Sequence, residues 1–83
     1  MIYRMYSIYD SIAREYGAPT LDHNDGTAVR NFAHLVRTSG GTLSTHRRDY
    51  ALYYIGDYDT EECTLLPKTP PVLVVRGDDI SND

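Results

Sequence analysis

The sequence predicts an α+β fold, in which an antiparallel sheet of three or four strands is covered on one face by one main helix. An amphipathic pattern with a capping signal at its start predicts that helix over residues 25–38. The chain of 83 residues is expected to form one domain over residues 1–77, followed by an acidic, disordered tail at 78–83. Segments of strand composition predict the sheet strands at residues 2–9, 50–56, 61–66 and, as a fourth, 72–76.

The first strand is expected to be central in the sheet or covered by a partner, because both of its faces carry apolar bulk. One face carries Ile2, Tyr6 and Ile8, and the other carries Tyr3, Met5 and Tyr9. Asp10 can then cap one or two helical turns over residues 11–16, which Gly17 and Pro19 would stop. Residues 18–23 should be extended.

The main helix begins with Asn24 and Asp25, which can cap it and complement the partial positive charge of its first turn. Gly40 and Gly41 are expected to end it, and residues 42–48 to form a polar connection. Its apolar face should pack against Ile8, Leu52 and Ile55 of the sheet. That face consists of Val29, Phe32, Ala33 and Val36.

The second half of the chain predicts a hairpin, in which residues 56–62 form an acidic turn between two strands. Pro67, Pro70 and Pro71 are expected to break regular structure after it. The apolar run from Val72 to Val75 is then either a last strand or an arm laid on another subunit.

Composition argues for a soluble intracellular protein with a small core. The single Cys63 cannot form an internal disulfide, and no apolar run approaches the roughly 20 residues needed to span a membrane. Residues 1–77 hold eight basic and nine acidic side chains, since three of the twelve acids lie at Asp78, Asp79 and Asp83. Eight tyrosines are many for such a core, so oligomerisation, most simply as a dimer, is expected.

No arrangement of residues in the sequence indicates catalysis, a metal or a cofactor. His23, His34, His46 and Cys63 lack the close spacing of a zinc site. Cys63 has no signature of a nucleophile around it, and the carboxylates between Asp57 and Glu62 lack the spacing of a calcium loop. We therefore expect a non-enzymatic protein without a metal or cofactor.

Arginine and tyrosine together indicate one candidate binding site. Single-stranded nucleic acid is held by rings that stack on bases and by arginines that contact phosphates. The candidate nucleic-acid-binding residues are Arg4, Arg47, Arg48, Tyr53 and Tyr54. The alternative is that these tyrosines build the core and a contact between subunits, which would make the chain an oligomeric protein–protein interaction module that engages another protein without touching DNA.

Four segments in order carry a resemblance to a known family: residues 6–10 (YSIYD), 16–19 (YGAP), 24–32 (NDGTAVRNF) and 49–59 (DYALYYIGDYD). Together they resemble the small nonstructural protein of gokushoviruses, which are single-stranded DNA phages of the Microviridae. The resemblance implies a phage protein of the host bacterial cytoplasm that is absent from the mature shell. It further implies a role in single-stranded DNA replication or genome packaging, with single-stranded DNA or phage or host replication and packaging proteins as partners. In the alternative of an interaction module, the chain would engage a phage or host protein without touching DNA. It provides no catalytic residues.

Overall fold

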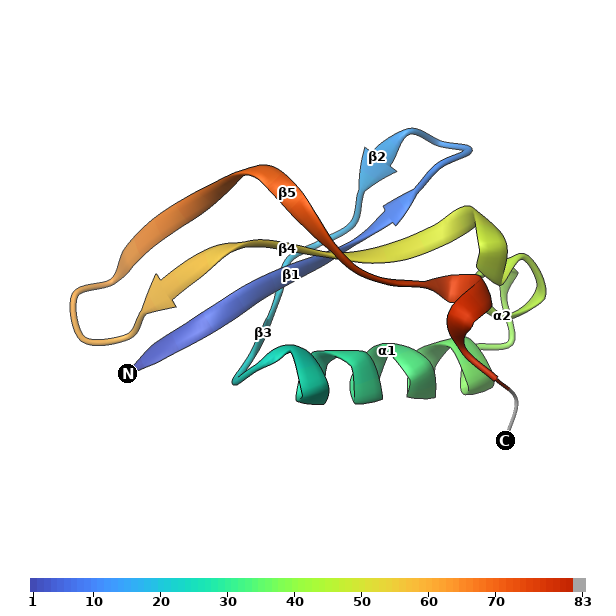
Figure 1. Cartoon of the computed structure of the whole chain (residues 1–83), viewed down its shortest axis with the longest axis horizontal. Coiled ribbons are helices and arrows are strands. Elements are labelled where there is room, and N and C mark those ends of the chain that lie inside the picture. The colour runs from blue at the N-terminus through green and yellow to red at the C-terminus, as the bar shows by residue number, and fades with distance from the viewer. Residues whose placement is uncertain (82–83) are drawn as a thin grey trace.

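The computed structural model describes residues 1–81 and confirms the α+β fold (Figure 1). Within those residues, one curled antiparallel sheet has the order β2-β1-β4-β5, and β3 pairs with β1 beside β2. The strands are β1 (Ile2–Asp10), β2 (Glu15–Tyr16), β3 (Thr20–Asp22), β4 (Tyr50–Asp59) and β5 (Thr64–Arg76). The helices are α1 (Asp25–Thr38), the short α2 (Thr42–Thr45) and two 3-10 turns, η1 (Arg47–Asp49) and η2 (Gly77–Asp79).

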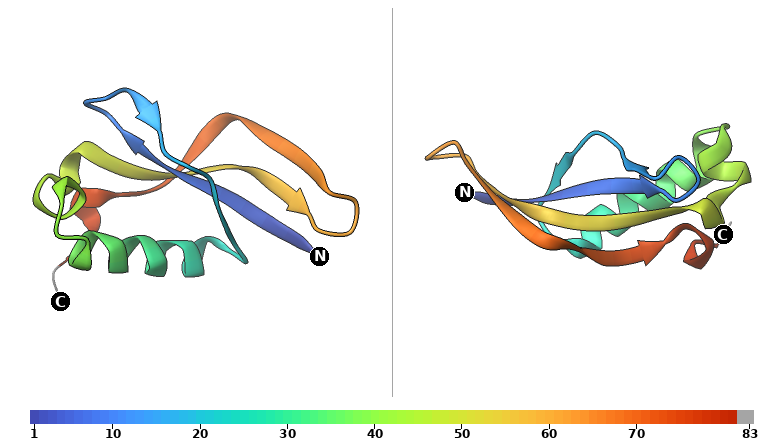
Figure 2. Two further views of the ribbon diagram at one scale, coloured as in Figure 1. Left: turned by 180° about the vertical axis from the view of Figure 1, so that it is seen from behind. Right: turned by 90° about the horizontal axis from the view of Figure 1, so that it is seen from above.

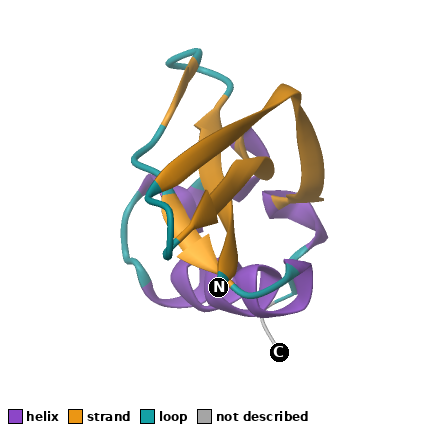
Figure 3. Ribbon diagram, turned by 90° about the vertical axis from the view of Figure 1, so that its left-hand side faces the viewer, coloured by secondary structure: helices purple, strands orange, loops and turns teal. Residues whose placement is uncertain are grey.

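The helix α1 lies along one side of the sheet, and the sheet curls over it (Figures 1 and 3). The β4–β5 hairpin and the start of β1 extend past the beginning of α1 as an arm, so the molecule is elongated, at 39 × 26 × 17 Å (Figure 2). We call the side of the sheet that packs on α1 the inner face and the opposite side the outer face. Since directly paired residues of neighbouring strands share a face, the register assigns each strand residue to one of them.

The bounds of α1 agree with the sequence prediction because its start is fixed by local chemistry. The Asn24 side chain accepts a hydrogen bond from the Thr27 backbone N–H at 2.9 Å, and the Thr27 hydroxyl lies 3.4 Å from the Asn24 N–H. This reciprocal pair satisfies two N–H groups that the first turn leaves without a helical partner.

The core lies between α1, the inner face of the sheet and the chain's C-terminal segment. Phe32, Ala33, Val36 and Leu52 are buried as expected, and Ile8 packs against them. Two expectations were wrong: Ala28 takes the buried place expected for Val29, and Ile55 is the extra residue of a β4 bulge opposite Met5 and Tyr6. The buried side chains of the core are Tyr6, Ala28, Phe32, Ala33, Val36, Leu52 and Ile80.

Two local predictions were wrong, and strand pairing explains both. Residues 11–14 form a turn instead of a helix, because residues 15–16 return to pair with β1. The two expected strands at 61–66 and 72–76 belong to one edge strand, β5. Its pairing with β4 is interrupted at residues 68–71, so Pro70 and Pro71 lie where no ladder bond is needed. The expected polar connection at residues 42–48 does join α1 to β4, and it contains α2 and η1.

The expected tail is partly folded. Residues 77–79 form η2, and Ile80 enters the core. Ser81 accepts a hydrogen bond from Arg37 at 2.8 Å, and the last two residues of the predicted tail, Asn82 and Asp83, lie outside the described residues.

Candidate nucleic-acid interface

The five predicted site residues do not lie together. Arg4 and Tyr54 are on the inner face near the start of α1, whereas Tyr53 is on the outer face. Arg47 and Arg48 lie in η1, at the end of the sheet where β4 begins. The sequence prediction therefore joined three separate places.

Arg4 and Tyr54 belong to a structural network. The Arg4 guanidinium lies 3.8 Å from the centre of the Tyr54 ring, and its Nε is 3.2 Å from an Asp25 carboxylate oxygen. The same Nε donates to the Tyr6 hydroxyl at 3.0 Å, and that hydroxyl donates to Asp25 at 2.6 Å. These contacts tie β1 and β4 to the first turn of α1, so both side chains are engaged within the fold.

The Tyr6 hydroxyl gives this network a pH dependence. Burial and the hydrogen bond to Asp25 raise the pKa of Tyr6 to about 12, above the value of about 10 in the unfolded chain. The folded state thus keeps a proton that the unfolded state releases. The stability that this proton contributes is complete below pH 10 and is lost as the pH rises through about 12.

We expect the loss to be roughly 2 kcal/mol between pH 9 and pH 12. Denaturant unfolding of the parent and of Tyr6→Phe at both pH values measures it. The parent should lose more stability than the variant, because the other tyrosines titrate in both proteins. Equal losses in the two proteins would contradict the assignment to Tyr6.

Arg47 also has a structural role. Its Nη1 donates to the Ile80 backbone carbonyl at 2.8 Å and its Nε to the Ser44 carbonyl at 3.4 Å. These bonds fasten the C-terminal segment to η1. Arg48 is exposed beside it, and a shallow hollow of about 400 Å³ is lined by Thr45, His46, Arg47, Arg48 and Asp78.

Tyr53 is part of an aromatic cluster with Tyr9 and Tyr16 on the outer face. The Tyr9 and Tyr16 ring centres are 4.6 Å apart, and Tyr53 lies 6.0 Å from Tyr9 and 5.6 Å from Tyr16, edge-on to both. The three rings come from β1, β2 and β4. The small, buried Ser7, which pairs with Tyr53, leaves room for rings from β2 and β4 to meet above β1.

Arg76 lies on the same face in line with these rings. The register aligns Tyr16 with Tyr9, Tyr9 with Ala51, and Ala51 with Arg76, which forms one row across four strands. Ala51 has the smallest side chain in the row and lies between the Tyr9 ring and the Arg76 guanidinium group. We call Tyr9, Tyr16, Tyr53 and Arg76 the tyrosine platform.

Tyr9, Tyr16 and Arg76 of this platform were not among the predicted site residues. Tyr16 was expected in a helical turn, and Arg76 stands outside any local cluster of basic residues. Only the cross-strand register brings them to Tyr53. The only sequence signal for this face is the alternation of side chains along β1 and β4, which places Tyr53 and Tyr54 on opposite faces of the sheet.

A cavity of about 270 Å³ opens between β3, α1 and the inner face. Its lining is mainly apolar, with Leu21, Phe32 and Leu35 among the side chains. Asp22 lies at its rim and accepts a hydrogen bond from Asn31 at 3.1 Å. The cavity resembles an incompletely filled core more than a reaction site.

Within residues 1–81, no group of three or more His, Cys, Asp or Glu side chains could hold a metal ion. None of the helices in that part of the chain is long and apolar enough to cross a membrane.

Comparison with known proteins gives one family. Residues 3–80 match the family model described as Phage ORF5 protein. No curated protein and no solved structure matches the chain.

Proposed function

Because this chain belongs to the Phage ORF5 protein family, we propose that it is a non-enzymatic accessory protein of a gokushovirus-type phage that binds single-stranded DNA. It would act in the host bacterial cytoplasm, during single-stranded DNA replication or packaging. The family supports a phage protein. The resemblance of residues 6–59 to the gokushovirus protein supports the narrower assignment.

The tyrosine platform is the observation that carries the DNA-binding proposal. Flat rings that stack on bases, next to an arginine that contacts phosphate, are the means by which proteins hold unpaired strands without reading sequence. The exposed Arg48 at the same end of the sheet adds a second cation. Arg4 and Tyr54, which are held in the structural network, are not part of the proposed site.

The charges predict weak binding with a small salt dependence. The chain has a net charge of −4, and the proposed site offers two cations, Arg76 of the platform and the nearby Arg48. Neutralising two phosphates of a single strand gives a slope of about −1.4 in a plot of log binding constant against log salt. Stacking, at about 1–3 kcal/mol per base, should therefore provide most of the affinity.

We expect Tyr53→Ser to weaken binding of a fluorescein-labelled oligothymidine about tenfold or more, with Tyr53→Phe close to the parent because it keeps the ring. Arg76→Gln should weaken binding and reduce the salt slope by about 0.7, whereas Arg30→Gln on the exposed side of α1 should change neither. Fluorescence anisotropy at about 20 mM and 200 mM salt measures these effects.

The absence of binding at low salt, or equal effects of the Arg76 and Arg30 variants, would refute the proposal. Thermal melts of each variant separate lost binding from lost folding. If DNA is not bound, the alternative of a protein–protein interaction module becomes the better account, since a tyrosine-rich face also suits a protein interface.

A further inference from the structure

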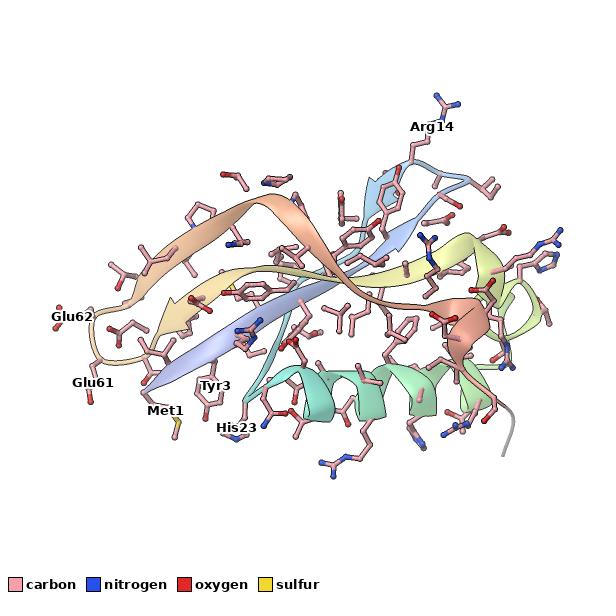
Figure 4. The ribbon with its side chains drawn as sticks, in the orientation of Figure 1. Met1, Tyr3, Arg14, His23, Glu61 and Glu62 are labelled. Atoms are coloured by element: carbon pink, nitrogen blue, oxygen red, sulfur yellow. The ribbon has the colours of Figure 1, made fainter. Side chains whose placement is uncertain are left out.

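The arm has an uncharged outer face. Two cross-strand rows cover it: Tyr3, Tyr58 and Leu65 form one, and Met5, Gly56 and Pro67 form the other, in which Leu21 of β3 also pairs with Met5. The His23 ring lies against Tyr3, with the ring centres 5.0 Å apart (Figure 4). No Asp, Glu, Lys or Arg belongs to either row. The rows of the inner face differ, since Arg4 pairs with Asp57 and Ile2 with Asp59.

We propose that this outer face of the arm is the contact between two copies of the chain, packed face to face about a two-fold axis. The surface would consist of Tyr3, Met5, Tyr58, Leu65 and Pro67. This inference is independent of DNA binding, because it uses none of the tyrosine platform.

The arm projects beyond α1, so no helix covers this part of the sheet (Figures 1 and 2). Leu65 is 64% exposed there. Tyrosine and methionine with few charges are typical of the centre of a protein interface. An exposed apolar surface of this kind indicates an interaction site.

The distribution of charge favours a second copy as the occupant. The chain is acidic overall, yet its acidic groups on the arm lie elsewhere: Asp57 and Asp59 are on the inner face, and Glu61 and Glu62 are at the hairpin tip (Figure 4). Two outer faces can therefore meet without bringing carboxylates together. A nucleic acid is a poor occupant, since the face offers no cation to its phosphates.

The other way to join two sheets, edge to edge along β5, is disfavoured. Pro67, Pro70 and Pro71 remove backbone N–H groups from that strand and protect it against further pairing. Face-to-face packing needs no N–H groups.

The size of the face predicts a weak dimer. Three strands spaced about 4.8 Å apart and about six residues long span roughly 15 by 20 Å. Such a patch is smaller than the roughly 800 Å² per partner of a standard stable interface. We therefore expect a dimer that forms with rising concentration and dissociates on dilution.

Two neighbouring leucines provide a matched test, because they are similarly exposed but lie on opposite faces. Leu65 is on the outer face, and Leu66, which pairs with Asp57 and is 59% exposed, is on the inner face. Sedimentation equilibrium should show a concentration-dependent dimer for the parent and for Leu66→Glu. Leu65→Glu should raise the dimer dissociation constant about tenfold or more.

A parent that stays monomeric up to about 1 mM would overturn the inference, as would equal effects of the two variants. Species that grow beyond a dimer would overturn the two-fold arrangement. Tyr58→Ser is a second variant on the outer face and should also weaken the dimer. Circular dichroism melts verify that each variant is folded, and the DNA titration of Leu65→Glu tests the two proposals separately.

Discussion

Replacement of Phe32 by alanine is expected to cost about 3–5 kcal/mol of folding free energy. Phe32 is 2% exposed and lies in the one core of the described chain, with Tyr6, Val36, Leu52 and Ile80 around it. Its truncation leaves a cavity that the neighbouring strands cannot easily fill, because they are held in register by backbone hydrogen bonds. Domains of this size have a total stability of about 5–15 kcal/mol, so the variant should be close to unfolding.

Urea unfolding followed by circular dichroism measures this cost. Leu35→Ala is the matched control, since Leu35 is on the same helix but 44% exposed, and it should cost less than about 1 kcal/mol. A Phe32→Ala midpoint equal to that of the parent would show that α1 does not pack on the sheet through this residue.

The parts of the fold that were predicted correctly are those set by local sequence. The Asn24 and Thr27 capping pair and the 3.6-residue spacing of apolar side chains define α1 from its own residues. The strand composition of residues 2–9 and 50–56 was equally sufficient, since these form the two central, most extensively paired strands.

The errors fall where a distant partner decides the conformation. Glu15 and Tyr16 form a two-residue strand only because β1 is there to pair with them. The prolines of β5 predict an interruption of the strand, yet prolines are tolerated in a strand at the edge of a sheet. Ile80 follows three acidic or glycine residues and has no periodic neighbours, so no sequence pattern indicates that it is buried in the core.

The candidate site was only partly predictable for a similar reason. Residue type indicated that arginine and tyrosine could bind an unpaired strand, but not which of them share a surface. Arg4 is engaged on the inner face by its contacts with Asp25 and Tyr54. Arg47, in η1, is engaged by its hydrogen bond to the Ile80 carbonyl. Arg76 reaches the tyrosines through a register of four strands, and that register depends on irregularities at Ile55, at residues 68–71 and at Val74.

Substitution of Gly77 by alanine is the second change from which we expect a large effect, several kcal/mol of destabilisation. A Cβ atom at this position would lie 1.8 Å from the Arg47 carbonyl oxygen and 3.0 Å from that of Tyr50. Both are backbone atoms, so no side-chain rotation can relieve the contact. The chain would have to separate η2 from η1.

That separation would break the Arg47 bond to the Ile80 carbonyl and withdraw Ile80 from the core. Gly41→Ala is the control, because a Cβ there meets no atom within 4 Å, and it should change stability by about 0.5 kcal/mol or less. Hydrogen exchange should show faster exchange of residues 76–81 in Gly77→Ala, together with a lower urea midpoint. Unchanged exchange and an unchanged midpoint would mean that the C-terminal segment is not docked on η1, and that the core closes without Ile80.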